Sequence, residues 1–91
     1  MFRISKTDQN TVVKLTIDGE LIKNHVAIAQ QCCEDLLDAG RTIEVVHRDV
    51  GVIDDDGRSW LGELLGRGVR VVGRNLYVSY VVDGLKRSAS R

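Results

Sequence analysis

The sequence predicts one small α/β domain, with a mostly parallel four-stranded sheet, an N-terminal antiparallel hairpin and about three helices. Two segments with alternating apolar and polar residues open the chain. Three segments with apolar residues at helical spacing follow, separated by short β-branched runs. Strands that alternate with helices favour parallel pairing through right-handed crossovers. The length of 91 residues is enough for one such domain.

The first two strands form the predicted hairpin. Residues 2–6 alternate, residues 7–10 carry the sequence Thr-Asp-Gln-Asn that is typical of a turn, and residues 11–18 alternate again. Every other residue of the second strand is apolar and is expected to face the core, namely Val13, Leu15 and Ile17. Gly19 is expected to end this strand.

The first two helices are predicted from apolar residues three or four positions apart. The first is expected to be capped by Asn24 and to end at Gly40. Its apolar positions are Val26, Ala29, Cys33, Leu36 and Leu37. The second follows Gly57 and ends at Gly66, with apolar positions Trp60, Leu61, Leu64 and Leu65.

Residues 42–47 and 69–72 are predicted to be the third and fourth strands, because β-branched residues dominate both. The third helix is expected to begin after Asn75, which can cap it, and to end near Val82. The dipeptide at residues 83–84, Asp-Gly, is the expected stop signal.

Composition and charge argue against several classes of function. Thirteen Lys and Arg residues balance thirteen Asp and Glu residues, so the chain has no basic excess for nucleic acid. No apolar run reaches the ~18 residues that span a bilayer, and the N-terminus has no secretory apolar core. We therefore expect no membrane insertion and a cytoplasmic location. The domain is expected to cover residues 1–85, with a basic, flexible tail at residues 86–91.

The two cysteines, Cys32 and Cys33, are adjacent. Neighbouring helical residues project about 100° apart, so a disulfide between them would be strained. No CxxC motif or histidine cluster accompanies them, and both are expected to be small core-facing residues. We expect no metal and no cofactor.

The most informative segment is residues 52–57, Val-Ile-Asp-Asp-Asp-Gly. An apolar run stops at three carboxylates and a glycine, and a helical pattern starts directly after them. Acidic side chains are favourable at a helix start, where backbone N–H groups lack internal partners and the helix dipole attracts negative charge. Three adjacent carboxylates also repel one another, so capping alone does not explain the set. A charged strand-to-helix corner is a common place for a site, and we call residues 54–57 the acidic corner.

This layout resembles the STAS domain family, the fold of bacterial anti-sigma-factor antagonists. In that family an apolar strand typically precedes Asp-Ser-Ser-Gly or Asp-Ser-x-Gly and an apolar helix, and here residues 53–57 read Ile-Asp-Asp-Asp-Gly before such a helix. The family also often shows Gly-Glu-Leu after the second strand, and here residues 19–21 carry it. The resemblance covers residues 2–85.

The sequence departs from the family pattern at several points. Asp55 replaces the serine that a partner kinase phosphorylates in the antagonists, and Ile22 replaces the acidic residue that often follows Gly-Glu-Leu. Arg58 stands where an apolar residue is frequent, which would change which partner fits. The family's final strand and helix have no clear counterpart.

The resemblance implies a non-catalytic protein-interaction module of bacterial regulation, similar to an anti-sigma-factor antagonist but without the serine switch. Asp55, at the phosphoserine-equivalent position, permanently carries part of the charge of a phosphoserine. The implied partner is an anti-sigma factor with serine kinase activity. The expected partner-binding residues are Asp54, Asp55, Asp56, Gly57, Arg58, Ser59, Gly19, Glu20 and Ile22.

Two alternatives stay open. Within the family, the small cytoplasmic STAS subunits of lipid-transport ABC systems dock on an ATPase and commonly lack a regulatory phosphoserine. Outside this role, three carboxylates could hold Mg²⁺ or Ca²⁺, and some STAS domains of anion transporters are reported to bind nucleotides. A metal- or nucleotide-binding domain is therefore the third hypothesis, although the sequence lacks EF-hand spacing and a glycine-rich phosphate loop.

The remaining candidates are expected to be structural. His25 and His47 are isolated in sequence from a suitable Ser or Cys nucleophile, so we expect no catalysis. Ser59 and Trp60 are expected to be a solvated helix serine and a core residue, respectively. The third helix leaves hardly any polar face, and a helix that is apolar all round is buried or covered. A homodimer or a docked partner on this helix is therefore expected.

Overall fold

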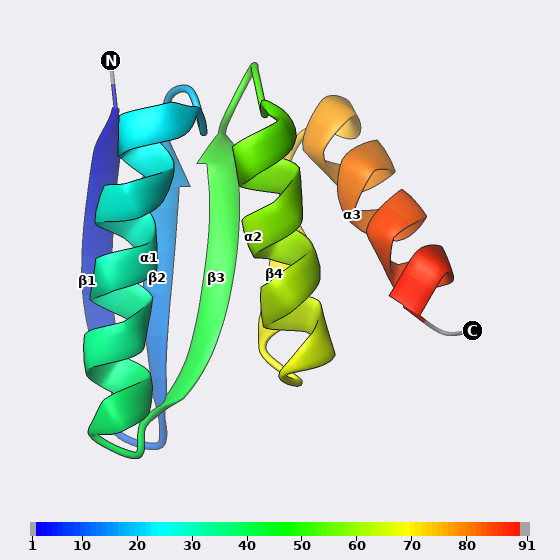
Figure 1. Cartoon of the computed structure of the whole chain (residues 1–91). Coiled ribbons are helices and arrows are strands. Elements are labelled where there is room, and N and C mark those ends of the chain that lie inside the picture. Colours follow the sequence, from blue (N-terminus) through cyan, green and yellow to red (C-terminus); the bar gives the residue numbers. More distant parts are fainter. Residues whose placement is uncertain (1, 90–91) are drawn as a thin grey trace.

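Residues 2–89, which the computed structural model describes, form a four-stranded sheet with three helices (Figure 1). The elements in chain order are β1 (Arg3–Gln9), β2 (Val12–Asp18), α1 (Lys23–Asp38), β3 (Thr42–Asp49), α2 (Asp55–Gly66), β4 (Arg70–Gly73) and α3 (Leu76–Ala89). The strands lie in the order β1-β2-β3-β4. β1 pairs antiparallel with β2, and the other two pairs are parallel. The predicted fold class is therefore confirmed.

The hairpin turn is tighter than the sequence predicted. β1 continues to Gln9, which pairs with Val12, so only Asn10 and Thr11 lie between the strands. Asn10 has a φ of 68°, a left-handed conformation that asparagine tolerates better than most residues. Turn-forming residues thus lie within β1, because pairing with a neighbouring strand outweighs their weak local preference.

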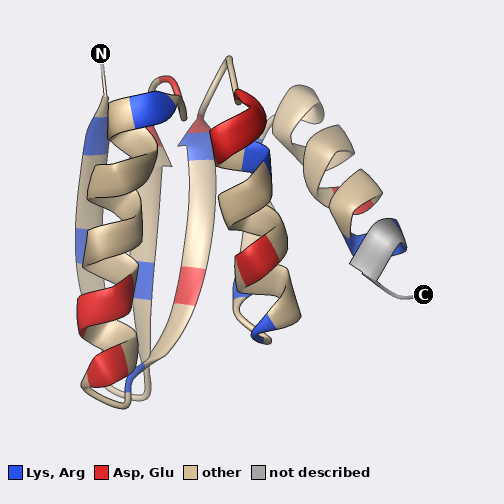
Figure 2. Cartoon of the chain, viewed as in Figure 1, with Lys and Arg blue, Asp and Glu red and all other residues tan. Residues whose placement is uncertain are grey.

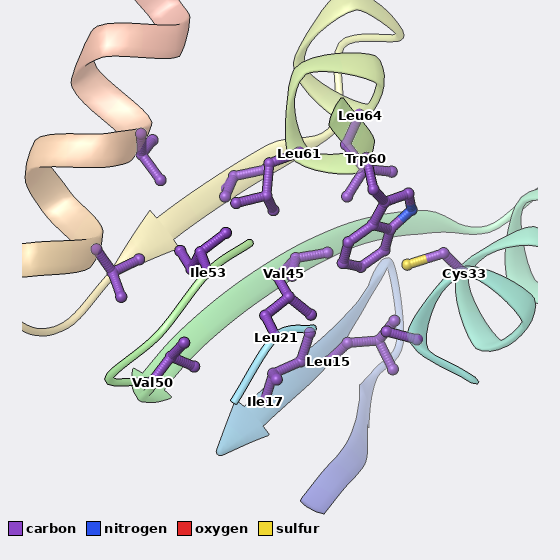
Figure 3. Close-up of a cluster of buried hydrophobic side chains, with 14 of the residues drawn as sticks. Leu15, Ile17, Leu21, Cys33, Val45, Val50, Ile53, Trp60, Leu61 and Leu64 are labelled. Carbon is purple, nitrogen blue, oxygen red and sulfur yellow. The ribbon is translucent and has the colours of Figure 1, made fainter. Parts of the chain in front are cut away.

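The first two helices, α1 and α2, cover the same face of the sheet, and α3 lies beside α2 at the β4 edge (Figure 1). The alternation predicted for β2 is confirmed, since Val13, Leu15 and Ile17 are buried. Their partners on β3 bring Ile43, Val45 and His47 to the same face. Trp60 is buried as expected and projects from α2 toward the sheet beside Cys33 of α1 (Figure 3). The core therefore lies between the sheet and the helices.

Two helix boundaries differ from the prediction. Asn24 does not cap α1, which begins at Lys23 after Ile22, and Ile22 supplies no side-chain cap. The third helix does not end near Val82 but continues through Asp83 and Gly84 to Ala89. Residues 86–89 of the predicted tail thus belong to α3, and residues 90–91 lie outside the described residues.

The start of α3 agrees with the sequence. Asn75 Oδ1 accepts the backbone N–H of Val78 at 2.8 Å, and its side-chain amide donates to the carbonyl of Val50 at 2.9 Å. Asn75 therefore caps the helix and also joins it to the segment that precedes the acidic corner. None of the helices within residues 2–89 is long and apolar enough to cross a bilayer.

Candidate functional site

The two predicted halves of the site lie side by side beyond the ends of β2 and β3. Leu21 and Ile53 form an isolated parallel bridge. The backbone N–H of Leu21 donates to the carbonyl of Val52 at 2.9 Å, and the N–H of Asp54 donates to the carbonyl of Leu21 at 3.3 Å. The loop at residues 19–22 and the acidic corner are therefore one continuous surface at the carboxyl ends of two parallel strands, where sites are common in α/β sheets.

Asp54 holds this surface together. Its Oδ1 accepts the backbone N–H of Gly57 at 2.9 Å, which is the N-cap interaction of α2. Its Oδ2 accepts the backbone N–H of Lys23, the first residue of α1, at 3.0 Å. One carboxylate thus satisfies an unpaired N–H at the start of each helix, including the helix whose own cap residue offers no side-chain acceptor.

Gly57 is buried, and the reason for a glycine is steric. A Cβ atom at this position would lie 2.6 Å from the carbonyl oxygen of Leu21 and 2.8 Å from Cγ2 of Ile53. Both distances are too short for a real contact, and the first involves backbone. The glycine therefore lets α2 approach the bridge between Leu21 and Ile53.

The other acidic-corner residues face solvent. Asp55 and Asp56 are exposed in the first turn of α2, and Arg58 and Ser59 are exposed directly after them. Among the described residues, Asp55, Asp56 and Arg58 have no ion-pair partner. Figure 2 shows the acidic start of α2 at the end of the sheet where β3 stops. The only fixed carboxylate of the three is Asp54, so the other two are available to a partner.

Two clefts flank α2 at this end. One, of 310 Å³, lies between α1 and α2 and includes Lys23, Asp56 and Ser59 in its lining. The other, of 300 Å³, lies between α2 and α3 and includes Arg58 and Tyr80. The predicted contact residues therefore divide between two sides of α2 and do not converge on one pocket.

The loop before α1 adopts unusual backbone conformations. Gly19 has a φ of 100°, and its N–H donates to the carbonyl of Asp49 at 2.9 Å. Glu20 is exposed, Ile22 is half-buried, and Lys23 has a φ of 37°. A positive φ is uncommon for a lysine, and here the hydrogen bond from its N–H to Asp54 accompanies it. The positions of the predicted contact residues Gly19, Glu20 and Ile22 are thus set by backbone hydrogen bonds at this loop.

His25 is part of this loop structure. Its ring stacks on Phe2 with centroids 4.4 Å apart, and Nδ1 lies 2.7 Å from the carbonyl oxygen of Glu20. The ring is therefore occupied on its face and at one nitrogen. This arrangement agrees with the structural role expected for His25.

The sequence does not reveal how two residues contribute to the site. Lys23 takes part through a backbone N–H, which no side-chain pattern reveals. Tyr77 of α3 accepts the backbone N–H of Ile53 on its hydroxyl oxygen at 3.2 Å. The phenolic hydroxyl within an apolar helix was the only available signal, because a half-buried tyrosine hydroxyl usually has a hydrogen-bond partner.

The buried nucleophilic and basic groups are poorly suited to catalysis. His47 is fully buried, neither ring nitrogen has a hydrogen-bond partner among the described residues, and burial lowers its pKa to about 4. Burial raises the pKa of the Cys33 thiol to about 12, so the reactive thiolate is disfavoured. Within residues 2–89 no group of three or more His, Cys, Asp or Glu side chains is arranged to hold a metal ion.

No protein-family model matches the sequence, and no curated protein matches it significantly. The assignment of a function therefore depends on the residues and their geometry.

Proposed function

We propose that this chain is a non-catalytic protein-interaction module, similar to a bacterial anti-sigma-factor antagonist, in which Asp55 occupies the position of the regulatory phosphoserine. The partner would contact the acidic corner, Arg58, Ser59 and the loop at residues 19–22. It would be an anti-sigma factor with a serine-kinase-like fold.

The observation that carries the proposal is the contrast between Asp54 and Asp55. Asp54 has both carboxylate oxygens hydrogen-bonded to backbone N–H groups, whereas Asp55 next to it is exposed and has no ion-pair partner among the described residues. The hydrogen bonds of Asp54 thus fix the backbone of the corner, and the charged side chain of Asp55 is exposed to solvent there. A rigid corner lowers the ordering cost of binding.

The same contrast counts against the metal hypothesis. Ca²⁺ and Mg²⁺ need several oxygen ligands around one point. Asp54 turns inward to the two helix starts, while Asp56 lines the cleft on the α1 side. The three consecutive carboxylates therefore diverge, and a site built from all of them would require the helix cap to open.

The charge of Asp55 predicts how a substitution at this position changes the affinity for the partner. A negative group at a contact surface weakens binding by repulsion and desolvation unless the partner offers a basic group. A partner that prefers the unphosphorylated antagonist state should therefore bind Asp55→Ser more tightly than the wild type. A partner with a basic patch should do the reverse.

The test is affinity capture from native cell lysate with the wild-type protein, Asp55→Ser and Asp55→Ala, followed by mass spectrometry. Asp38→Ser is the matched control, because Asp38 is an exposed carboxylate at the last residue of α1, far from that helix's start. We expect capture of an anti-sigma factor, altered by both Asp55 variants and unchanged by the control.

Capture of an ABC ATPase instead would support the alternative function, a subunit of a lipid-transport system. The ATPase would then contact the surface proposed here for the anti-sigma factor. Equal capture by all four proteins would show that Asp55 is not part of the contact with the partner. If purified anti-sigma factor fails to bind any form in calorimetry, the regulatory proposal is wrong.

A further inference from the structure

The outer side of α3 carries exposed apolar residues that the proposed corner contact does not use. Leu76 is 91% exposed, Tyr80 is 75% exposed and Tyr77 is 38% exposed. Val52, next to the residue that Tyr77 contacts, is 46% exposed. We call these four residues the α3 patch. Large apolar side chains gathered in this way mark an interaction surface more often than chance exposure does.

Charges of both signs border this patch on α2. Arg58 lines the cleft between α2 and α3 together with Tyr80. Asp55 lies three positions earlier on the same helix, which places it one turn away on the same side. The two side chains do not pair with each other in the structure, although their spacing would allow it.

We propose that the α3 patch, together with Asp55 and Arg58, is the contact surface for a second copy of this chain in a two-fold dimer. A two-fold interface must be complementary to itself. If one residue of the first copy contacts a second residue of the other copy, the same contact also occurs with the two copies exchanged. An apolar centre with one acid and one base beside it satisfies this condition. Asp55 of each copy would face Arg58 of the other.

Charge favours a second copy as the occupant, and the α3 patch supplies part of the area that a dimer needs. The net charge of the chain is zero, so no long-range repulsion opposes self-association. A whole aromatic side chain accounts for roughly 150–250 Å², and Tyr77 and Tyr80 expose only part of theirs, so the patch supplies a few hundred square ångströms. Stable interfaces bury ~800 Å² on each side, and the bordering part of α2 must supply the remainder.

This inference goes beyond the proposed function and does not rest on it. The dimer is expected for the purified chain alone, even if the acidic corner has no partner. Asp55 and Arg58 belong to both surfaces, however, so dimerisation would compete with binding of a partner at the acidic corner. The two proposals therefore fail in different experiments.

The first test is sedimentation of the purified full chain over a concentration series up to about 1 mM. We expect a reversible monomer–dimer equilibrium. Tyr80→Asp should raise the dimer dissociation constant at least ~30-fold, as for a central contact residue. Ile28→Asp is the matched control, since Ile28 is a half-exposed apolar residue on α1. It should change the constant by less than about twofold.

The second test exchanges the charges. Arg58→Glu and Asp55→Lys should each weaken the dimer, because each places like charges opposite one another twice. An equimolar mixture of the two variants should form a heterodimer, since both contacts are then between opposite charges. Circular dichroism checks that each variant is folded before sedimentation.

A wild type that stays monomeric throughout the series would overturn the proposal. So would a dimer that Tyr80→Asp leaves intact, because its contact would lie elsewhere. Two charge variants that fail to form a heterodimer when mixed would disprove the pairing of Asp55 with Arg58.

Discussion

Oδ2 of Asp54 accepts the backbone N–H of Lys23 at 3.0 Å across 31 residues of sequence, and this contact ties the start of α1 to the start of α2. The other oxygen of the same carboxylate caps α2 through Gly57. The corner is therefore built by one side chain that serves two helices. This makes Asp54 a structural residue first, whatever partner the neighbouring carboxylates contact.

Asp54→Ala should destabilise the fold by about 2 kcal/mol, because it removes an N-cap and leaves the N–H of Lys23 without its acceptor. The measurement is the free energy of unfolding from urea denaturation at neutral pH. Asp55→Ala is the control and should cost less than about 1 kcal/mol, since only its attraction to the helix dipole is lost. Equal losses for the two variants would show that Asp54 does not hold the corner.

Gly57→Ala should be more damaging than an ordinary substitution of glycine by alanine. The added Cβ would lie 2.6 Å from a backbone oxygen, so α2 or the loop at Leu21 must move. We expect a loss of at least about 2 kcal/mol in unfolding free energy, as for other overpacked sites. Gly66 is the matched control within the same helix, because its Cβ would meet nothing within 4 Å. Gly66→Ala should be neutral or stabilising by up to about 1 kcal/mol. Equal effects of the two substitutions would contradict the close approach.

The sequence predicted the elements and their order because apolar periodicity is a local signal, visible in β2 at Val13, Leu15 and Ile17. It predicted the position of the acidic corner for the same reason. It did not predict the contact between Asp54 and Lys23, or that between Tyr77 and Ile53, because both are tertiary and one partner in each is backbone. The roles of the three aspartates therefore became distinct only in the structure.

The end of the third helix was predicted wrongly for a comparable reason. Asp83 and Gly84 are a typical stop signal, yet the helix continues past them. A glycine within a helix costs about 1 kcal/mol, which is less than the burial of a single large apolar side chain contributes. Val81 and Val82 are buried on one side of Gly84, and Leu85 packs against the core on the other. Packing thus outweighs the local signal.

Gly84→Ala should stabilise the protein by roughly 0.5–1 kcal/mol if α3 is continuous, because alanine is the better helix former. The structure leaves open space where the Cβ would be added. Thermal and urea denaturation measure the gain, and helical circular dichroism should not decrease. A helix that ended at Asp83 would place Gly84 outside it, and the substitution would then give no gain.

Acidification should destabilise the fold through His47 before Asp8 and Asp18 lose their contribution. Burial lowers the pKa of His47 from its ordinary 6.5 to about 4 in the folded state. The unfolded chain therefore takes up this proton first, and stability falls as the pH is lowered from 6.5 toward 4. The shift corresponds to a loss of about 3 kcal/mol by the lower end of this range. Protonation would put a charge among core residues, where residues 2–89 offer no acceptor for either ring N–H.

His47→Leu should remove this dependence, because an apolar side chain of similar size needs no hydrogen-bond partner. The measurement is the free energy of unfolding at pH 7, 6, 5 and 4.5 for both proteins. Asp8 and Asp18 do not interfere in this range. Arg41 and Arg48, respectively, lower their pKa values below the ordinary 3.8, so their contribution is lost only in more acidic solution. Parallel pH profiles for the wild type and the variant would show that His47 does not control stability between pH 6.5 and 4.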